Sequence, residues 1–223
     1  MTLTVLIAGA GPGVSGSLAR VYAAEGARLL LLGADDDVLA TLAGEVEAAG
    51  GSSSTRVVDL TDDTATRATI AEVVDAEGGD ARLDVVHFNP SAYREQDPLE
   101  LSVDGLLDDV RLGVAALLSV VQAARPYLHD GARITVTGSE AADKPWFGAA
   151  SLGVQKAGVR NLVRSIDTRL REDGVRAVSV TVCGLLADEG PFTPDRVAEQ
   201  LRAAVEQGGA SGDDWRSEIR YEG

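Results

Sequence analysis

Four glycines stand close together near the start of the chain, where an apolar run gives way to a helical pattern. They are Gly9, Gly11, Gly13 and Gly16. A glycine turn between a strand and a helix lets backbone approach a pyrophosphate, which then rests at the positive N-terminus of the helix. The spacing Gly11-x-Gly13-x-x-Gly16, or Gly9-x-x-x-Gly13 in a second interpretation, therefore predicts a dinucleotide-binding turn. A tight turn without a ligand is the alternative.

Three acidic residues follow the second predicted strand, Arg28–Leu32. In dinucleotide-binding units an acid at this point bonds the ribose hydroxyls of NAD, whereas an arginine accepts the 2′-phosphate of NADP. Asp35, Asp36 and Asp37 would repel a 2′-phosphate, so the sequence favours NAD over NADP. The alternative is that these carboxylates cap the next helix and interact with its dipole.

Apolar runs of strand length alternate with segments of helical period along most of the chain. The predicted strands are Thr2–Ala8, Arg28–Leu32, Thr55–Val58, Leu83–Phe88, Arg133–Val136, Val175–Val182 and Trp215–Tyr221. The predicted helices are Val14–Glu25, Asp36–Ala49, Asp63–Glu77, Ser102–Leu128, Ala150–Glu172 and Pro194–Glu206. Continuous apolar strands separated by such helices indicate βαβ units on a parallel sheet with both faces buried. We expect one doubly wound α/β domain over residues 1–223.

The composition excludes several classes of function. The 223 residues include 35 Asp and Glu against 20 Lys and Arg, a formal charge of −15, which repels phosphate backbones and anionic lipid. We therefore expect no nucleic-acid or membrane partner. Cys183, His87 and His129 show no metal-ligand spacing, so no metal site is predicted. No apolar stretch reaches roughly 18 residues, and the run Leu3–Ala8 is too short for a signal peptide, so we expect a soluble, cytoplasmic protein.

Motifs in order along nearly the whole chain resemble the short-chain dehydrogenase/reductase family. Residues 9–15 resemble its TGxxxGxG turn, with Ser15 in place of the last glycine. The resemblance implies a Rossmann-type, mostly parallel seven-stranded sheet of order 3-2-1-4-5-6-7 with helices on both faces. It also implies a site for NAD or NADP. The residues that correspond to this cofactor site are Gly9, Gly11, Gly13, Val14, Asp35, Asp59, Leu60, Asn89 and Lys156.

The same resemblance assigns the catalytic positions and shows two departures from the family pattern. Ser139 stands where the family has its catalytic serine, and Lys156 where it has the lysine of YxxxK. The tyrosine position, four residues before Lys156, holds Leu152, and Arg111 takes the place of the asparagine of the family's proton relay. The family's tyrosine delivers a proton to the developing alkoxide, which is worth roughly 10²–10⁴-fold in rate, and leucine has no proton to give.

Other residues near the predicted site leave alternatives open. Tyr93 follows the fourth strand and could reach the site, or be an ordinary loop aromatic. His87 lies in an apolar strand, which favours a core histidine, and Glu140 faces either solvent or the pocket. The substrate-covering segment near 185–193 is short by comparison with the family.

Three function hypotheses follow. The first is an NAD(P)-dependent oxidoreductase acting on a small carbonyl or alcohol, with standard Ser-Tyr-Lys turnover in doubt. The second is a catalytically impaired relative, a pseudoenzyme with a binding, regulatory or assembly role. The third is a cofactor-independent enzyme of cyclase or lyase type that reuses the fold. The resemblance further implies a homodimer or homotetramer that binds a small molecule.

Overall fold

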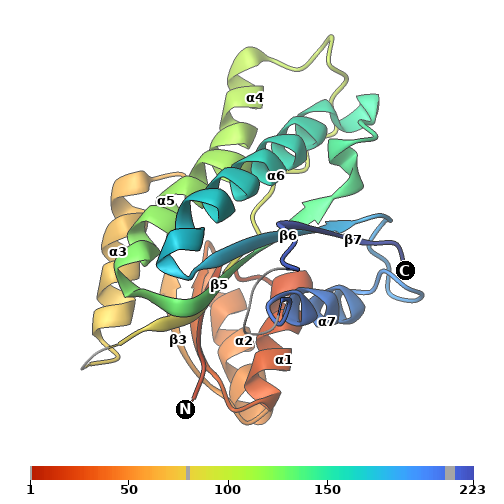
Figure 1. Cartoon of the computed structure of the whole chain (residues 1–223). Helices are drawn as coiled ribbons and strands as arrows, with labels where there is room; N and C mark the ends of the chain where they lie inside the picture. The colour runs from red at the N-terminus through yellow and green to blue at the C-terminus, as the bar shows by residue number, and fades with distance from the viewer. Residues whose placement is uncertain (1, 79–80, 209–213) are drawn as a thin grey trace.

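The computed structural model describes residues 2–78, 81–208 and 214–223, and its seven strands form one sheet (Figure 1). The strands are β1 (Thr4–Ala8), β2 (Arg28–Gly33), β3 (Ser52–Val57), β4 (Leu83–Phe88), β5 (Leu128–Ser139), β6 (Arg176–Val182) and β7 (Glu218–Tyr221). Their order is β3-β2-β1-β4-β5-β6-β7, which confirms the prediction. Every neighbouring pair is parallel, so the carboxyl ends of all seven strands lie at one edge.

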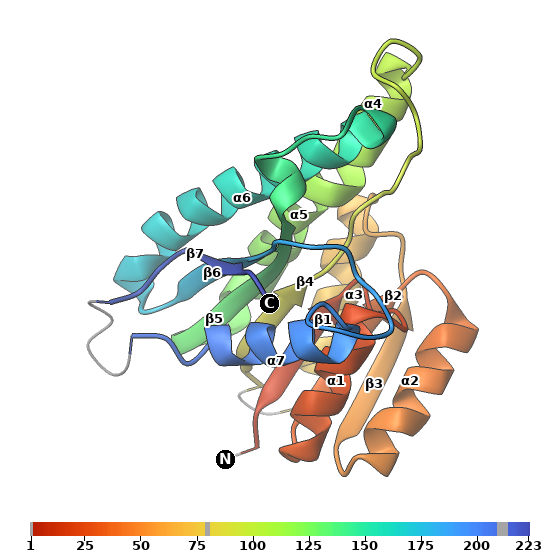
Figure 2. The ribbon, with the colours of Figure 1, turned by 90° about the vertical axis from the view of Figure 1, so that its right-hand side faces the viewer.

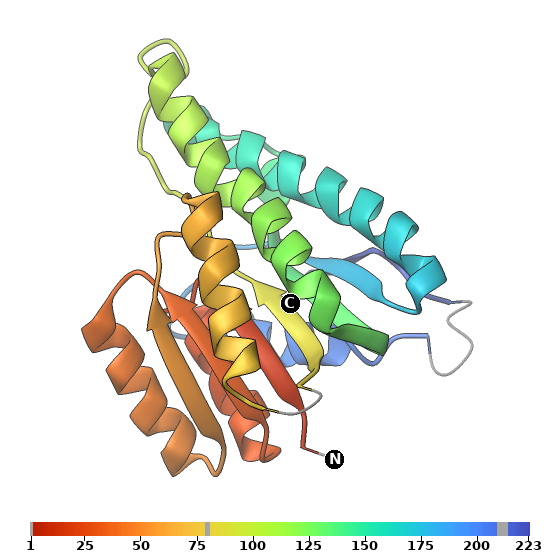
Figure 3. The ribbon, with the colours of Figure 1, turned by 90° about the vertical axis from the view of Figure 1, so that its left-hand side faces the viewer.

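The helices divide between the two faces of the sheet (Figures 2 and 3). One face is covered by α1 (Val14–Ala24), α2 (Asp36–Ala48) and α7 (Pro194–Ala204). The other is covered by α3 (Asp63–Asp75), α5 (Ala116–Ala124) and α6 (Ala150–Leu170), and α4 (Val103–Val110) packs against α6 beyond the sheet. Each face of the sheet has its own hydrophobic core, and successive residues of a strand point to opposite cores. Leu6 packs on the α3–α5–α6 side, and Ile7 packs on the α1–α2–α7 side. This double burial explains why the central strands are continuously apolar.

Side-chain caps set where most of the helices begin. Asp35, Asp62, Ser102 and Thr193 each accept a hydrogen bond from the backbone N–H three residues on. Such caps satisfy amide groups that have no partner within the helix. Helix α1 differs, because its N-cap residue is Gly13 and no described side chain caps it.

The prediction of one uninterrupted α-helix over Ser102–Leu128 is wrong. A π-helical turn, Arg111–Ala115, separates α4 from α5, and a short 3₁₀ turn, Arg125–Tyr127, ends the segment. A π turn adds a residue to the helical repeat without changing the apolar pattern enough to reveal it. Strand β5 also begins earlier than predicted, at Leu128, because Leu128 pairs with Leu83 before an irregularity, after which Arg133 pairs with Val85.

Two edge strands differ from their predicted bounds. Strand β3 begins at Ser52 rather than Thr55, because its half-exposed edge position tolerates serines that carry no apolar signal. Strand β7 begins at Glu218 rather than Trp215. Trp215 instead lies between the guanidinium groups of Arg133 and Arg176, whose carbons are 5.2 and 5.0 Å from its ring centroid.

Among the described residues, no helix is both long and apolar enough to cross a bilayer.

Candidate active site

A cavity of about 350 Å³ opens at the carboxyl ends of the central strands. Its lining residues are Gly13, Val14, Asn89, Ser91, Tyr93, Thr137, Gly138, Ser139, Leu152, Lys156, Val182, Gly184 and Leu186. A larger hollow of about 660 Å³, which includes Thr4 and Arg28, lies at the opposite edge, where the strands begin. Open parallel sheets bind ligands at the carboxyl edge, so the smaller cavity is the candidate site.

The glycine turn forms one wall of this cavity. Gly9 has φ +84°, and a Cβ at this residue would lie 2.7 Å from the Pro90 ring. A Cβ at Gly16 would lie 2.7 Å from the carbonyl oxygen of Gly11, so both positions require glycine. At Gly13, by contrast, no described heavy atom lies within 4 Å of the place a Cβ would take. The turn therefore leaves open space at the uncapped N-terminus of α1.

Ser15 stabilises this turn in a way that its sequence position did not reveal. Its hydroxyl accepts a hydrogen bond from the Gly11 N–H at 3.0 Å and donates to the Gly9 carbonyl oxygen at 3.0 Å. The Asn89 amide also donates to this hydroxyl, at 3.4 Å. The residue that replaces the family's last glycine thus fixes the backbone of the turn.

A polar chain links the ends of β4 and β5 beneath the cavity. The Thr137 hydroxyl donates to Asn89 Oδ1 at 2.8 Å, and His87 Nδ1 lies 2.8 Å from the Thr135 hydroxyl. His87 is fully buried, and desolvation lowers its pKa to about 3. It is therefore neutral at ordinary pH, as the core-histidine interpretation expects.

Ser139, Leu152 and Lys156 meet in this cavity. The Lys156 Nζ donates to the Thr137 carbonyl oxygen at 2.9 Å, and burial lowers its pKa to about 8. Ser139 Oγ accepts a hydrogen bond from the Ala141 N–H at 3.2 Å. Leu152 lies one helical turn before Lys156 on α6 and presents an apolar surface to the cavity.

Four other residues from the sequence analysis lie outside the cavity lining. Asp35 caps α2 by accepting from the Val38 N–H at 3.0 Å, as its alternative interpretation expects. Asp59 accepts bonds from the Thr61 backbone and hydroxyl, and these bonds lower its pKa. Leu60 is buried. Arg111 is more than half exposed, pairs with Asp108 at 2.8 Å and is not among the lining residues.

Several lining residues were not singled out from the sequence. Thr137 was recognisable in principle, because it stands two residues before Ser139 and strand side chains repeat every second residue. Gly184 and Leu186 come from the segment 183–193 that joins β6 to α7. The Tyr221 hydroxyl donates to the Pro191 carbonyl oxygen at 2.6 Å, which ties this segment to β7.

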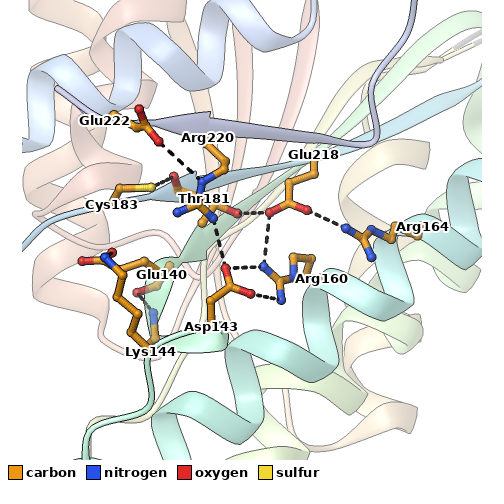
Figure 4. Close-up of polar contacts among 12 residues, drawn as sticks. Glu140, Asp143, Lys144, Arg160, Arg164, Thr181, Cys183, Glu218, Arg220 and Glu222 are labelled. Atoms are coloured by element: carbon orange, nitrogen blue, oxygen red, sulfur yellow. Dashed lines mark hydrogen bonds and ion pairs between the residues drawn. The ribbon is translucent and has the colours of Figure 1, made fainter.

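An ion-pair network joins β7 and α6 to the residues that follow β5 (Figure 4). Asp143 accepts two bonds of 2.7 Å from Arg160 and one of 3.0 Å from Arg220. Glu218 accepts from Thr181 at 2.9 Å and from Arg164 at 2.7 Å. The hydrogen bonds from Arg160 are the main reason that the pKa of Asp143 falls to about 2. The network therefore ties the segment that follows β5 to α6 and β7.

Comparison with known proteins decides the family. The family model described as short chain dehydrogenase matches residues 3–189. The chain belongs to the short-chain dehydrogenase family. Within this family, "Oxidoreductase UcpA" from Salmonella typhimurium is 27% identical over 216 residues, which cover 91% of this chain and 80% of UcpA.

Two solved structures share the fold of this short-chain dehydrogenase. A metagenomic short-chain oxidoreductase in complex with NADP is 24% identical, with a TM-score of 0.84 over 98% of this chain and 96% of that one. The NADH-dependent reductase A1-R′ complexed with NAD is 18% identical, with a TM-score of 0.81 over 98% of this chain and 94% of that one.

Proposed function

We propose that this short-chain dehydrogenase binds a nicotinamide dinucleotide and interconverts a small carbonyl compound and its alcohol, without the family's usual tyrosine. The observation that carries the proposal is the convergence of Gly13, Asn89, Ser139 and Lys156 on one cavity at the carboxyl edge of the sheet. These residues come from four different segments of the chain, so their convergence is a property of the whole fold.

The residues present fit the cofactor. The open space at Gly13 and the uncapped N-terminus of α1 offer backbone N–H groups and a positive dipole end to a pyrophosphate. Lys156 and Asn89 offer donors to the nicotinamide half. When bound, the nicotinamide supplies or accepts the hydride, and Ser139 offers a hydrogen bond to the oxygen of the substrate.

We expect NAD to bind more tightly than NADP. Strand β2 ends at Gly33, and Ala34 follows it, so neither position offers an arginine to a 2′-phosphate. The Asp35 carboxylate is engaged in capping α2, with Asp36 and Asp37 beside it in the first turn. Three carboxylates so close together repel a phosphate group whether or not one of them bonds the ribose.

A second candidate function is a dinucleotide-binding protein that has lost turnover, and Leu152 is the observation that favours it. The third hypothesis, a cofactor-independent enzyme, predicts an empty glycine turn.

A melting experiment with NAD, NADH, NADP and NADPH separates these hypotheses. Binding to the folded state raises the melting temperature as the ligand concentration passes its Kd. We expect a rise with NAD or NADH that exceeds the rise with NADP or NADPH. No rise with any of the four would contradict cofactor binding, and a rise without turnover of a broad carbonyl panel would favour the binding protein.

We also propose a homo-oligomer. Large apolar side chains are exposed on the outer helices, among them Val103, Leu107, Leu118 and Val154. Exposed apolar side chains on neighbouring helices are typical of surfaces that a second copy of a chain covers.

A further inference from the structure

The segment that follows β4 is held at two adjacent points beside the cavity. The Ala92 N–H donates to Gln155 Oε1 at 2.9 Å, and Gln155 Nε2 donates back to the Ala92 carbonyl oxygen at 3.1 Å. Two residues on, the Arg94 guanidinium makes two bonds of 2.9 Å to the Asp109 carboxylate. The residue between these anchors is Tyr93.

The side chains of Gln155 and Asp109, which anchor the segment, are both buried. Burial of such polar groups destabilises the fold unless they have hydrogen-bond partners. Gln155 is fully buried and Asp109 is 3% exposed. Burying an amide or a carboxylate without partners destabilises a fold by several kcal/mol, so these side chains persist only because of the bonds that they make. The Arg94 guanidinium is the main reason that the pKa of Asp109 is lowered, so Asp109 is ionised at neutral pH.

The π-helical turn makes room for the first anchor. A Cβ at Gly113 would lie 2.9 Å from Gln155 Cδ, so any larger residue there would displace the carboxamide. Gly113 lies within Arg111–Ala115, where α4 passes into α5. The irregular helix, the glycine and the buried glutamine thus form one arrangement around the Ala92 backbone.

Tyr93, the residue between the two anchors, lines the candidate site together with Ser139, Leu152 and Lys156. Among the described lining residues it carries the one phenol, and a phenol is a much stronger acid than the hydroxyl of a serine. It is 64% exposed, so water reaches the phenol oxygen.

We propose that Tyr93 supplies the proton that Leu152 cannot, with Gln155 and Asp109 as positioning residues. The proposal rests on the proposed function. In carbonyl reduction, hydride adds to the carbonyl carbon while the O–H bond of Tyr93 breaks and its proton bonds the carbonyl oxygen. The product is the alcohol, and the phenolate then takes a proton from water. In alcohol oxidation the same proton returns to the phenolate as hydride leaves.

The first test compares Tyr93→Phe with the control Tyr127→Phe, which removes a phenol that bonds Asp75 on a different surface. We expect Tyr93→Phe to lower kcat by about 100-fold and to leave the Kd for NADH unchanged. Tyr127→Phe should retain the kcat of the unmodified chain. An unchanged kcat in Tyr93→Phe would overturn the proposal, and so would NADH binding without turnover of any carbonyl in the panel. Failure to bind NADH would instead overturn the proposed function itself.

A double-mutant cycle separates positioning from mere structural support. Gln155→Leu removes both bonds to Ala92 and should lower kcat roughly as much as Tyr93→Phe. If Gln155 acts through Tyr93, the double variant should be little slower than either single variant. Effects on kcat that multiply in the double variant would show that Gln155 acts independently and would contradict its positioning role.

A chemical readout that does not depend on turnover completes the test. Tetranitromethane nitrates exposed phenols, and peptide mass spectrometry locates the product. We expect NADH with a saturating small ketone to protect Tyr93 and to leave the nitration of Tyr127 unchanged. Equal nitration of Tyr93 with and without these ligands would place the phenol outside the substrate site and overturn the proposal.

Discussion

Leu152 lies one helical turn before Lys156 on α6, and both side chains line the cavity that also contains Ser139. The cavity thus joins the hydroxyl of Ser139 and the amine of Lys156 with an apolar side chain that has no proton to give.

Leu152→Tyr should raise reductase activity on a panel of small ketones and aldehydes, by about tenfold or more, because it restores a general acid beside Lys156. The decrease in NADH absorbance measures the rate. Ser165→Tyr is the matched control, since Ser165 lies on the same helix, is exposed and does not line the cavity. No gain in Leu152→Tyr with NADH binding intact would show that the pocket has diverged beyond this residue.

His87 should make the fold sensitive to acid. The pKa of His87 is about 3 in the folded chain and has its ordinary value of 6.5 in the unfolded chain. Between pH 6.5 and pH 3 the unfolded chain therefore binds a proton on His87 that the folded chain does not bind. The free energy of unfolding should therefore fall as pH drops from 6.5 towards 3, by up to about 1.4 kcal/mol per pH unit from this group. Urea unfolding of His87→Gln should show a shallower decline, whereas His129→Gln should retain the decline. Equal slopes in all three proteins would exclude this account of His87.

Lys156 should destabilise the fold at neutral pH. Burial lowers its pKa from 10.5 to about 8, so the folded chain binds fewer protons than the unfolded chain between these values, and stability rises there with pH. Removing the buried charge in Lys156→Met should raise the free energy of unfolding at neutral pH by up to about 3 kcal/mol. The lost hydrogen bond to Thr137 should offset about 1 kcal/mol of this gain. The advantage of the variant should shrink above pH 8. Lys144→Met, which changes an exposed lysine, should show no such trend, and a pH-independent difference for Lys156→Met would refute the prediction.

Leu118→Arg should shift the chain towards a smaller assembly, because it places a charge among the exposed apolar side chains of the outer helices. Light scattering after size-exclusion chromatography measures the mass. Val57→Arg is a suitable control, since Val57 is also an exposed apolar residue and lies at the end of β3, away from the outer helices. A monomeric unmodified chain, or an unchanged mass in Leu118→Arg, would contradict an interface at this position.

The strand order could be predicted from the resemblance to the family, and the strands and the glycine turn from local patterns. Positive φ at Gly9 and the apolar runs of the central strands are properties of short segments. The role of Asp35 could not be decided in this way, because it depends on where β2 ends and α2 begins.

Contacts between distant segments account for what the sequence did not reveal. Arg111 lies at the start of a π turn that the apolar pattern does not show, and it pairs with Asp108. The bridge from Gln155 to Ala92 joins residues 63 apart in sequence, and neither residue type predicts it. Sequence alone favoured an ordinary loop aromatic for Tyr93, whereas in the structure Tyr93 is among the residues that line the cavity, because the segment after β4 folds back beside α6.

A calorimetric titration of the chain with NADH tests the central claim that the cavity at Gly13 holds a dinucleotide. Gly13→Glu places a carboxylate where no described atom lies within 4 Å, and Gly44→Glu adds the same charge on α2 at a position equally free of contacts. We predict saturable binding below about 1 mM for the unmodified chain and for Gly44→Glu, and at least a tenfold weaker affinity for Gly13→Glu. Equal affinity in all three proteins, or no binding to the unmodified chain, would contradict the account.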